Sequence, residues 1–269
     1  ALSAPVELKL DPDEAWFVER HRHAVRCVNE AGVRFQRTPE GQIHAFTPGF
    51  RIRLGSAEEL QILTDILVKG EYRFATQGPV VVADVGCNVG IASLQFPSAH
   101  GCEVHAFELV PPTADAARAN FELNPALAGR IHLHGYGLGG SAGTAKVAFD
   151  PQSPWSSSMI SSNLLGAQAT TRVDAEIRRA DVEVEALLRL HPEATLVLKM
   201  DVEGAEYEII DCLREARLLD RVGVLMMEWH RLEPSHDPHR LVEAMHEAGL
   251  RVSESGRSDA RFGYLFASR

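Results

Sequence analysis

Residues 80–90 read Val80-Val81-Val82-Ala83-Asp84-Val85-Gly86-Cys87-Asn88-Val89-Gly90 and decide the fold of this 269-residue chain. The run of apolar, mostly β-branched residues predicts a strand buried on both faces, and the glycines after it predict a tight turn into a helix. Gly86 and Gly90 let the backbone approach a ligand closely, and Asn88 tolerates the left-handed conformation that such a turn requires. We interpret the stretch as the first strand, turn and helix of a nucleotide-binding sheet.

The residues around this turn disfavour a phosphorylated coenzyme. The dinucleotide fingerprint Gly-x-Gly-x-x-Gly is not met, because Asn88 and Ile91 stand at its second and third glycine positions. No lysine or arginine occurs from Phe74 to Ala117. A phosphate placed about 4 Å from the Asp84 carboxylate would cost on the order of 4 kcal/mol at an intermediate effective dielectric. S-adenosylmethionine fits better as the cofactor, because it has no phosphate and carries a sulfonium and an ammonium.

A second acid supports this interpretation. Residues 103–108 predict the next strand, which ends in Glu108, and 108 − 84 places that acid 24 residues after Asp84. An acid about 20 residues after the turn binds ribose hydroxyls in Rossmann-type folds. Either carboxylate alone could be a solvated strand end, but the pair favours a cofactor crevice. The predicted cofactor-binding residues are Asp84, Gly86, Cys87, Asn88, Gly90, Glu108, Leu109, Tyr136 and Gly137.

Composition narrows the class of protein. Apolar residues make up 45% and charged residues 24% of the chain, which is typical of a globular α/β domain. The net charge of −10 argues against a nucleic-acid partner, and neither a membrane span nor a signal peptide is evident. The cysteines lack CxxC spacing, so we expect reduced thiols in a cytoplasmic protein and no cysteine zinc site. They are Cys27, Cys87, Cys102 and Cys212.

The chain divides into an N-terminal cover, residues 1–55, and a Rossmann-like domain, residues 56–269. The cover is predicted as a helix and a hairpin that lie over one sheet edge or over the mouth of the active site. Ser56 and Glu59 form a capping box that begins the next helix. From there, strands and helices alternate, which predicts a parallel sheet with helices on both faces. Five parallel strands and a closing hairpin give seven strands, with the last one antiparallel.

Two regions of this domain leave alternatives open. A hairpin is predicted as an insertion at about 141–178, and Trp155 with the serines after it could line a pocket or form a solvated loop. His132 and His134 share one face of the third predicted strand, 130–136. They could be a metal pair or hydrogen-bonded sheet histidines, and we favour the latter because no third ligand is evident.

A later segment of the chain resembles the signature of a known protein family. Leu198-Lys199-Met200-Asp201-Val202-Glu203-Gly204-Ala205-Glu206 resembles the Lys-x-Asp-Val-Glu-Gly-x-Glu signature of the FkbM family of S-adenosylmethionine-dependent methyltransferases. With the turn at 84–90 and Phe107-Glu108, the resemblance covers roughly residues 56–250. It implies the class I methyltransferase fold and methylation of hydroxyls in sugars or in secondary metabolites such as polyketides. Cys87 and Leu109 depart from the family's commoner alanine and proline.

Methyl transfer to an alcohol requires in-line positioning, and it requires a base or a metal to move the hydroxyl proton. Asp201 ends the fourth predicted strand, and Glu228 and His230 follow the fifth, so all three should face the crevice. His230 suits a base near neutral pH, although it could be a surface histidine. Lys199 could transfer a proton or form a buried pair at the strand end. Asp201 could instead bind a divalent cation with Glu228 or His230, which leaves metal dependence open.

We therefore expect a cytoplasmic O-methyltransferase that uses S-adenosylmethionine and acts on a small hydroxylated metabolite, with no nucleic-acid partner. The alternatives are a cofactor-binding module without turnover and, disfavoured by the missing glycines, a nucleotide-dependent oxidoreductase. The oligomeric state stays open, with a homo-oligomer as one alternative.

Overall fold

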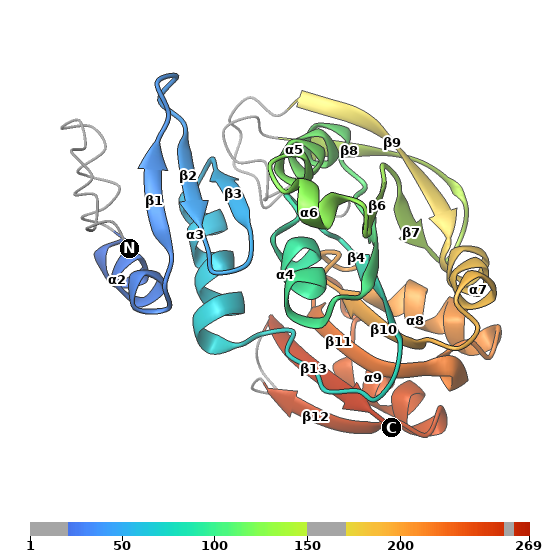
Figure 1. The fold of residues 1–269 in the computed structure, drawn as a ribbon. Helices are drawn as coiled ribbons and strands as arrows, with labels where there is room; N and C mark the ends of the chain where they lie inside the picture. The colour runs from blue at the N-terminus through green and yellow to red at the C-terminus, as the bar shows by residue number, and fades with distance from the viewer. Residues whose placement is uncertain (1–20, 150–170, 256–260) are drawn as a thin grey trace.

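The computed structural model describes residues 21–149, 171–255 and 261–269, so Trp155 and its neighbouring serines lie outside the described residues. Its main sheet consists of the strands β4 (Val80–Val85), β5 (Glu103–Phe107), β6 (Ile131–His134), β10 (Thr195–Met200), β11 (Val222–His230), β12 (Arg251–Ser255) and β13 (Phe262–Ser268). Their order is β12-β13-β11-β10-β4-β5-β6, and β13 runs antiparallel to both of its neighbours (Figure 1). This is the predicted class I Rossmann-like methyltransferase fold, with seven mostly parallel strands and the last one antiparallel.

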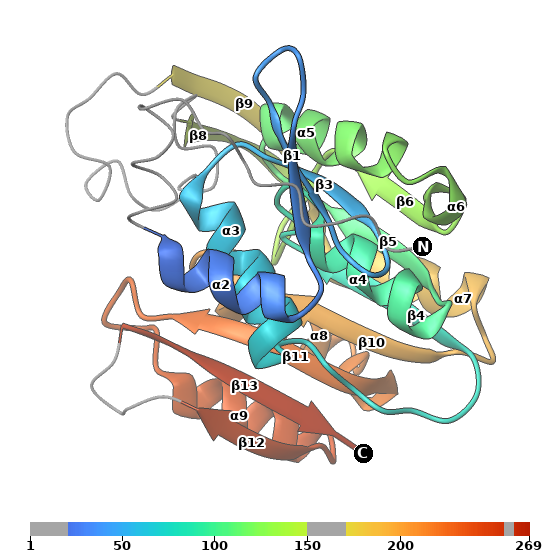
Figure 2. The same cartoon turned by 60° about the vertical axis from the view of Figure 1, so that its left-hand side comes forward.

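Two apolar cores cover the two faces of this sheet, because side chains alternate along each strand. Val81 and Val85 of β4 belong to one core, and Val82 belongs to the other. The helices that build these cores are α3 (Ala57–Thr64), α4 (Ile91–His100), α5 (Pro111–Glu122), α7 (Ala180–Leu190), α8 (Glu206–Glu215) and α9 (Pro238–Glu247). The last three cover the Val81 face and the first three the Val82 face, so both faces are covered as predicted (Figure 2).

The N-terminal region forms a three-stranded antiparallel sheet rather than a simple hairpin. It comprises α2 (Arg22–Glu30), β1 (Arg34–Arg37), β2 (Ile43–Phe46) and β3 (Arg51–Leu54), with strand order β1-β2-β3. The sheet stands on the side of α4 and α5 (Figures 1 and 2), and Ile52 packs in the same core as Val82. The outer edge of β3 bonds to side chains of two asparagines: Arg51 N–H donates to Asn124 Oδ1 over 2.7 Å, and Arg53 N–H donates to Asn120 Oδ1 over 3.0 Å.

The helix after this sheet begins with the predicted capping box. Ser56 Oγ accepts the Glu59 N–H over 3.1 Å, and the Glu59 carboxylate accepts the Gly55 N–H. The helix then widens into a π-helix, η1 (Asp65–Lys69), and ends at Gly70 with a φ of 76°. None of the helices in the described ranges is both apolar and long enough to cross a membrane.

The predicted insertion contains two antiparallel strands, β8 (Gly143–Phe149) and β9 (Thr171–Arg179). A short strand, β7 (Gly137–Gly139), pairs in parallel with β9 and was not predicted. Val147 and Ala175 pack against Val110, at the start of α5. The remaining helical turns are α6 (Pro125–Ala128) and η3 (Leu219–Arg221).

Candidate functional site

The turn after β4 has the backbone that its sequence predicts. Gly86, Asn88 and Gly90 have φ values of 79°, 51° and 87°. The N–H groups of Gly86 and Cys87 donate to the Phe107 carbonyl over 2.9 and 3.0 Å, which holds the turn against the end of β5. A Cβ on Gly86 would lie 1.9 Å from the carbonyl oxygen of Asp201. Only glycine therefore lets this turn touch the end of β10.

A first cavity opens beside this turn and has a volume of about 720 Å³ including its mouth. Its carboxylates come from Glu108, Asp201 and Glu203, and among the described residues that line it there is no lysine or arginine. Its other walls are Val85, Gly86, Asn88, Phe107, Leu109, Val110, Thr113, Gly137, Leu138, Val202 and Ala205. The chemistry of this cavity suits a ligand with positive charge and an apolar ring.

A second cavity of about 490 Å³ lies on the other side of the turn and shares Gly86, Asn88 and Asp201 with the first. Polar groups come from Glu71, Tyr72, Lys199, Glu228 and Tyr264, together with Asp65. Apolar walls come from Ile62, Ile66, Val89, Ile91 and Ala92, and Cys87 completes the lining. The two cavities meet at the carboxyl ends of β4 and β10, where a group could pass between their ligands.

Lys199 and Asp84 form a buried ion pair behind the turn. They are register partners on β10 and β4, and Lys199 Nζ lies 3.0 Å from Asp84 Oδ1. The ammonium also donates to the Gly86 carbonyl over 2.7 Å, and Ser93 Oγ donates to Asp84 Oδ2 over 2.6 Å. Burial lowers the pKa of Lys199, but Asp84 and Asp201 raise it by more, so the ammonium stays charged. The structure thus shows the buried pair, while a proton-transferring role for Lys199 stays a prediction. Asp84 lines neither cavity.

Glu108 joins the end of β5 to the turn. Its carboxylate accepts the N–H of Asn88 and the N–H of Val110, each over 2.9 Å. Burial raises the pKa of Glu108 to about 7, although both hydrogen bonds oppose the rise. Each oxygen keeps a second lone pair that can accept a hydroxyl hydrogen from a ligand in the first cavity.

Asp201 and Glu228 are two interacting acids at the border of the second cavity. Burial raises the pKa of Asp201, against the attraction of Lys199 and His230. Burial and the neighbouring Asp201 charge raise the pKa of Glu228 to about 7. Because the two groups interact, an observed pKa belongs to the pair. A carboxylate that gains and loses its proton near neutral pH can act as a general base.

His230 does not have the state of a base. Its Nδ1 lies 2.7 Å from Glu206 Oε1, and its Nε2 lies 3.6 Å from Glu203 Oε2 and 3.8 Å from Glu228 Oε1. Burial lowers the pKa of His230, but Glu206 and Glu203 raise it by more, to about 9. The imidazole is therefore protonated at neutral pH, and it lines neither cavity. The sequence did not indicate a protonated His230, because the histidine is on β11 and its partner Glu206 is on α8.

A cation could be held beside the same acids. One ligand atom each from Asp201, Glu203 and His230 lies within 4.8 Å of the others. The protonated His230 must first lose its proton before it can bind a metal. A metal ion at this position would therefore have to displace the proton on His230.

The structure brings many of the predicted residues to the two cavities. Gly86, Asn88, Glu108, Leu109 and Gly137 line the first, Cys87, Lys199 and Glu228 line the second, and Asp201 lines both. Gly90 instead makes room for the Phe121 ring, since a Cβ there would lie 2.4 Å from it. Tyr136 hydrogen-bonds to Glu183 and His134, away from the first cavity.

Sequence reasoning missed Glu71, Tyr72 and Tyr264 in the second cavity. These residues come from the loop after η1 and from β13, far from the recognised motifs. No local pattern marks them. The left-handed backbone of Tyr72, with a φ of 59°, is visible in the structure alone.

Comparison with known sequences and structures gives a consistent result. The family description "Methyltransferase FkbM domain" matches residues 84–252. No curated protein matches the chain significantly. A solved FkbM methyltransferase from Methylobacillus flagellatus is 13% identical, with a TM-score of 0.47 and coverage of 97% of this chain and 63% of that one. Aeropyrum pernix fibrillarin, solved with natively bound S-adenosyl-L-methionine, is 12% identical, with a TM-score of 0.43 and coverage of 88% and 94%.

The sequence analysis excluded a nucleic-acid partner, and that exclusion is wrong. The proteins of similar fold include one from Streptococcus pneumoniae described as a putative tRNA (m1A22) methyltransferase. It is 13% identical with a TM-score of 0.42, and the match covers 79% of this chain and 70% of that one. A net charge of −10 is a sum over the whole chain and does not describe one local surface. At this identity the likeness concerns the fold and does not assign RNA as a substrate.

Proposed function

We propose, from the premise that this chain belongs to the FkbM family of methyltransferases, that it transfers the methyl group to a hydroxyl of a small metabolite bound in the second cavity. Membership makes the chain an S-adenosylmethionine-dependent methyltransferase. The acceptor and its reacting atom are the proposed part.

The observation that carries the proposal is the charge of the two cavities. The first is lined by three carboxylates, and its described lining residues include no lysine or arginine. The Lys199 ammonium in the second cavity is already paired with Asp84. Such a site attracts the sulfonium and ammonium of S-adenosylmethionine and repels a pyrophosphate. The donor set therefore fits this cofactor.

Within the first cavity, we assign the ribose hydroxyls to Glu108 and the adenine ring to the slot between Leu109 and Leu138. Asp201, at the border of the two cavities, faces the sulfonium. When bound, the cofactor supplies an electrophilic methyl group with a neutral sulfide as the leaving group. The protein's contribution is to hold the acceptor oxygen in line and to remove its proton.

Glu228 is our candidate for the base. It lines the second cavity, and the rise of its pKa to about 7 places half of the population in the basic form near neutral pH. Glu228 would accept the proton that the acceptor hydroxyl loses, while the bound cofactor would supply the methyl group. The protonated His230, 3.8 Å from Glu228, acts as a positioning residue that holds the surrounding carboxylates. A divalent cation at Asp201, Glu203 and His230 is the alternative way to activate the hydroxyl.

The lining of the second cavity suits a neutral hydroxylated acceptor of the sugar, glycoside or polyketide type. Tyr72 and Tyr264 provide rings and hydroxyls, and the isoleucines of α3, η1 and α4 provide an apolar wall. Acidic acceptors are disfavoured, since Glu71 and Glu228 would repel them.

The test is methyl transfer from S-adenosylmethionine labelled on the methyl group. The panel contains glycosides, polyketides, acidic analogues and total RNA, and products are detected by mass. We expect label on a neutral hydroxylated compound, abolished by Asp201→Ala and retained by the surface control Asp211→Asn. Binding of NAD without binding of the methyl donor would contradict the cofactor assignment. Label on RNA alone would contradict a small-molecule acceptor, and donor binding without transfer to any compound would favour the silent module.

A further inference from the structure

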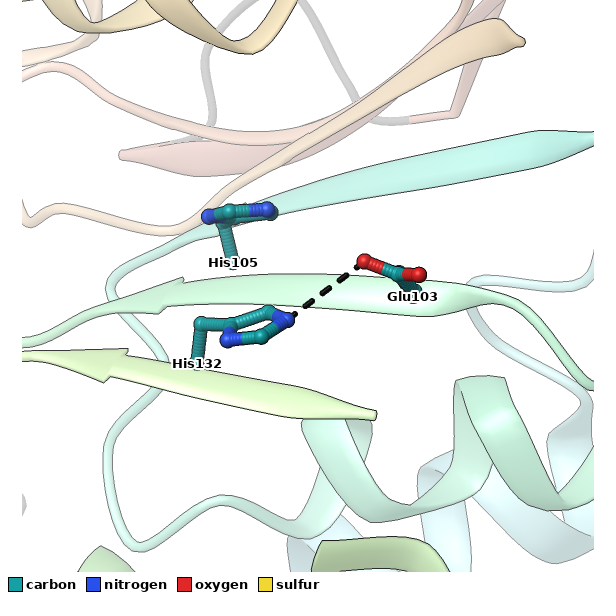
Figure 3. A group of neighbouring side chains, drawn as sticks. All are labelled: Glu103, His105 and His132. Carbon is teal, nitrogen blue, oxygen red and sulfur yellow. Dashed lines mark ion pairs between the residues drawn. The ribbon is translucent and has the colours of Figure 1, made fainter. Parts of the chain in front are cut away.

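A cluster of histidines lies at the edge of the main sheet that β6 forms. Glu103 and His105 project from β5 and His132 from β6, all to the same side of the sheet (Figure 3), because His105 and His132 are register partners. One ligand atom from each lies within 4.8 Å of the others. His132 Nε2 is 3.4 Å from Glu103 Oε2 (dashed line in Figure 3).

A fourth side chain joins the group from another element. His191 follows α7, and its Nε2 lies 3.4 Å from His105 Nε2 and 3.8 Å from Glu103 Oε2. In a tetrahedral zinc site with Zn–N bonds of about 2.0–2.1 Å, neighbouring ligand atoms are about 3.4 Å apart. Three separations in this group, His132 to Glu103, His191 to His105 and His191 to Glu103, are 3.4, 3.4 and 3.8 Å, close to the spacing that ligands of one ion have.

The hydrogen bonds behind His105 fix its protonation. Tyr136 Oη donates to Glu183 Oε2 over 3.0 Å, so it accepts from His134 Nδ1 at 3.1 Å. His134 then carries its hydrogen on Nδ1, and its Nε2 accepts from His105 Nδ1 over 3.1 Å. His105 Nε2 is then an acceptor that faces His191 Nε2 at 3.4 Å, and a metal ion would replace the hydrogen between the two nitrogens. A metal-binding histidine whose other nitrogen donates to a partner has this arrangement.

We propose that Glu103, His105, His132 and His191 bind a Zn²⁺ ion. The set combines imidazoles and one carboxylate, which suits this ion. His134 is a hydrogen-bonded sheet histidine, as favoured from the sequence, whereas His132 lies beside Glu103 and His105. His134 serves as the hydrogen-bond partner and not as a ligand.

Binding requires one movement. The rings of His105 and His132 are stacked, with centroids 4.7 Å apart and an angle of 28° between planes. His132 must turn its Nε2 toward the ion shared with His105. Its side chain is 47% exposed and can rotate, whereas His105 is buried and held by His134.

The ion would connect β5, β6 and the segment after α7. Glu103 is the first residue of β5, so the site lies at the amino ends of the strands, opposite the carboxyl ends that form the two cavities. It is thus a stabilising site separate from methyl transfer.

The experiment uses the full chain after chelator treatment. Zn²⁺ is added in a calorimetric titration, the melting temperature is recorded, and Co²⁺ serves as a probe because a tetrahedral site gives it a visible absorption band. We expect one Zn²⁺ per chain and a rise in melting temperature. Glu103→Gln and His132→Ala change half-exposed side chains. Each should weaken binding by at least about 100-fold, the upper end of what loss of an outer hydrogen-bond partner costs.

Two controls address the other metal-binding groups of the described residues. His23 Nε2 lies 3.6 Å from Cys27 Sγ on α2, so the double variant His23→Ala with Cys27→Ser removes that pair. Glu203→Gln removes the set beside His230. Both should bind Zn²⁺ as the unchanged chain does. The proposal fails if the chain takes up no Zn²⁺, or if these controls abolish the binding while Glu103→Gln and His132→Ala retain it. Circular dichroism without metal verifies that every variant folds.

Discussion

The Glu228 carboxylate gives methyl transfer a specific pH dependence. Because the base must be deprotonated and the pKa of Glu228 is raised to about 7, kcat/KM should increase about tenfold per pH unit below that value and level off above it. Glu228→Gln should reduce kcat by about 10²–10⁴-fold and remove the ascending limb. Methyl-transfer rates between pH 5 and 9 measure both effects.

His230 provides the comparison for this experiment. The pKa of its ring is raised to about 9, so His230→Gln should lower the rate without removing the ascending limb near pH 7. If His230→Gln removes that limb and Glu228→Gln leaves it, the histidine is the base after all.

Substitution of Gly86 by alanine should cause both backbone strain and a steric clash. Gly86→Ala places a Cβ 1.9 Å from the Asp201 carbonyl, at a φ of 79°. We expect a loss of about 2–5 kcal/mol in the free energy of unfolding, from left-handed strain of about 1–2 kcal/mol and from overpacking of about 1–3 kcal/mol. Denaturant unfolding gives this value, and cofactor binding should be lost as well.

Gly78 is the matched control, because its φ is 81° and nothing lies within 4 Å of its Cβ position. Gly78→Ala should therefore show the strain of about 1–2 kcal/mol alone and keep cofactor binding. Equal losses for the two variants would mean that the contact with Asp201 has no energetic effect.

Single residues were predictable from sequence where their state depends on nearby residues. The left-handed Asn88 follows from its place between two glycines in a tight turn. The protonated His230 and the pair between Lys199 and Asp84 depend on contacts across 24 and 115 residues, since 230 − 206 is 24 and 199 − 84 is 115. Such contacts leave no local pattern.

At the scale of elements, the outer edge of β3 has no neighbouring strand, and its backbone hydrogen-bonds instead to side chains of α5 and of the turn after it. Asn124 Nδ2 donates to the Arg51 carbonyl over 2.7 Å, and its Oδ1 accepts the Arg51 N–H. Asn124→Ala leaves both backbone groups without these partners. We expect a loss of about 1–3 kcal/mol in unfolding free energy, measured by denaturant titration.

Glu122, the last residue of α5 and two positions before Asn124, is exposed and provides the control. Glu122→Ala should change stability by less than about 0.5 kcal/mol. If Asn124→Ala costs no more than this control, the asparagine does not hold the N-terminal sheet to α5.

Elements with periodic patterns were predicted well, and those set by packing were not. The capping box at Ser56 and the alternation from Val80 onward located the helices and strands of the main sheet. The strand β1 has the sequence Arg34-Phe35-Gln36-Arg37, which has one apolar residue and no alternation. β7 consists of Gly137-Leu138-Gly139 and forms because β9 lies beside it. Neither sequence has a strand pattern of its own.

For the whole molecule, cofactor binding should appear as thermal stabilisation. A ligand at about 100 times its Kd adds about 2.7 kcal/mol to the free energy of unfolding. Each kcal/mol shifts the melting temperature of a chain of this size by about 2–4 °C, so S-adenosylmethionine should raise it by about 5–11 °C. A thermal melt with and without the cofactor measures this shift.

NAD at the same concentration is the control, and it should leave the melting temperature unchanged. Its pyrophosphate would face Glu108, Asp201 and Glu203 without a free cation among the described lining residues. A shift with NAD that equals the shift with S-adenosylmethionine would contradict the charge argument for the site.

The sheet as a whole followed from the sequence, because strands of this type must be covered on both faces and connected through helices. The second cavity did not follow, because its walls meet only when α3, η1 and β13 pack near the ends of β10 and β11. Its shape is a property of the assembled chain.

The two cavities share Gly86, Asn88 and Asp201, at the turn after β4 and the end of β10, and the second adds residues 62–72 and Tyr264, which the first lacks. Under the proposed function, the acceptor would thus be chosen largely by a stretch of sequence that does not touch the donor. Redesign of residues 62–72 and of Tyr264 should then change the acceptor while the affinity for the methyl donor is kept.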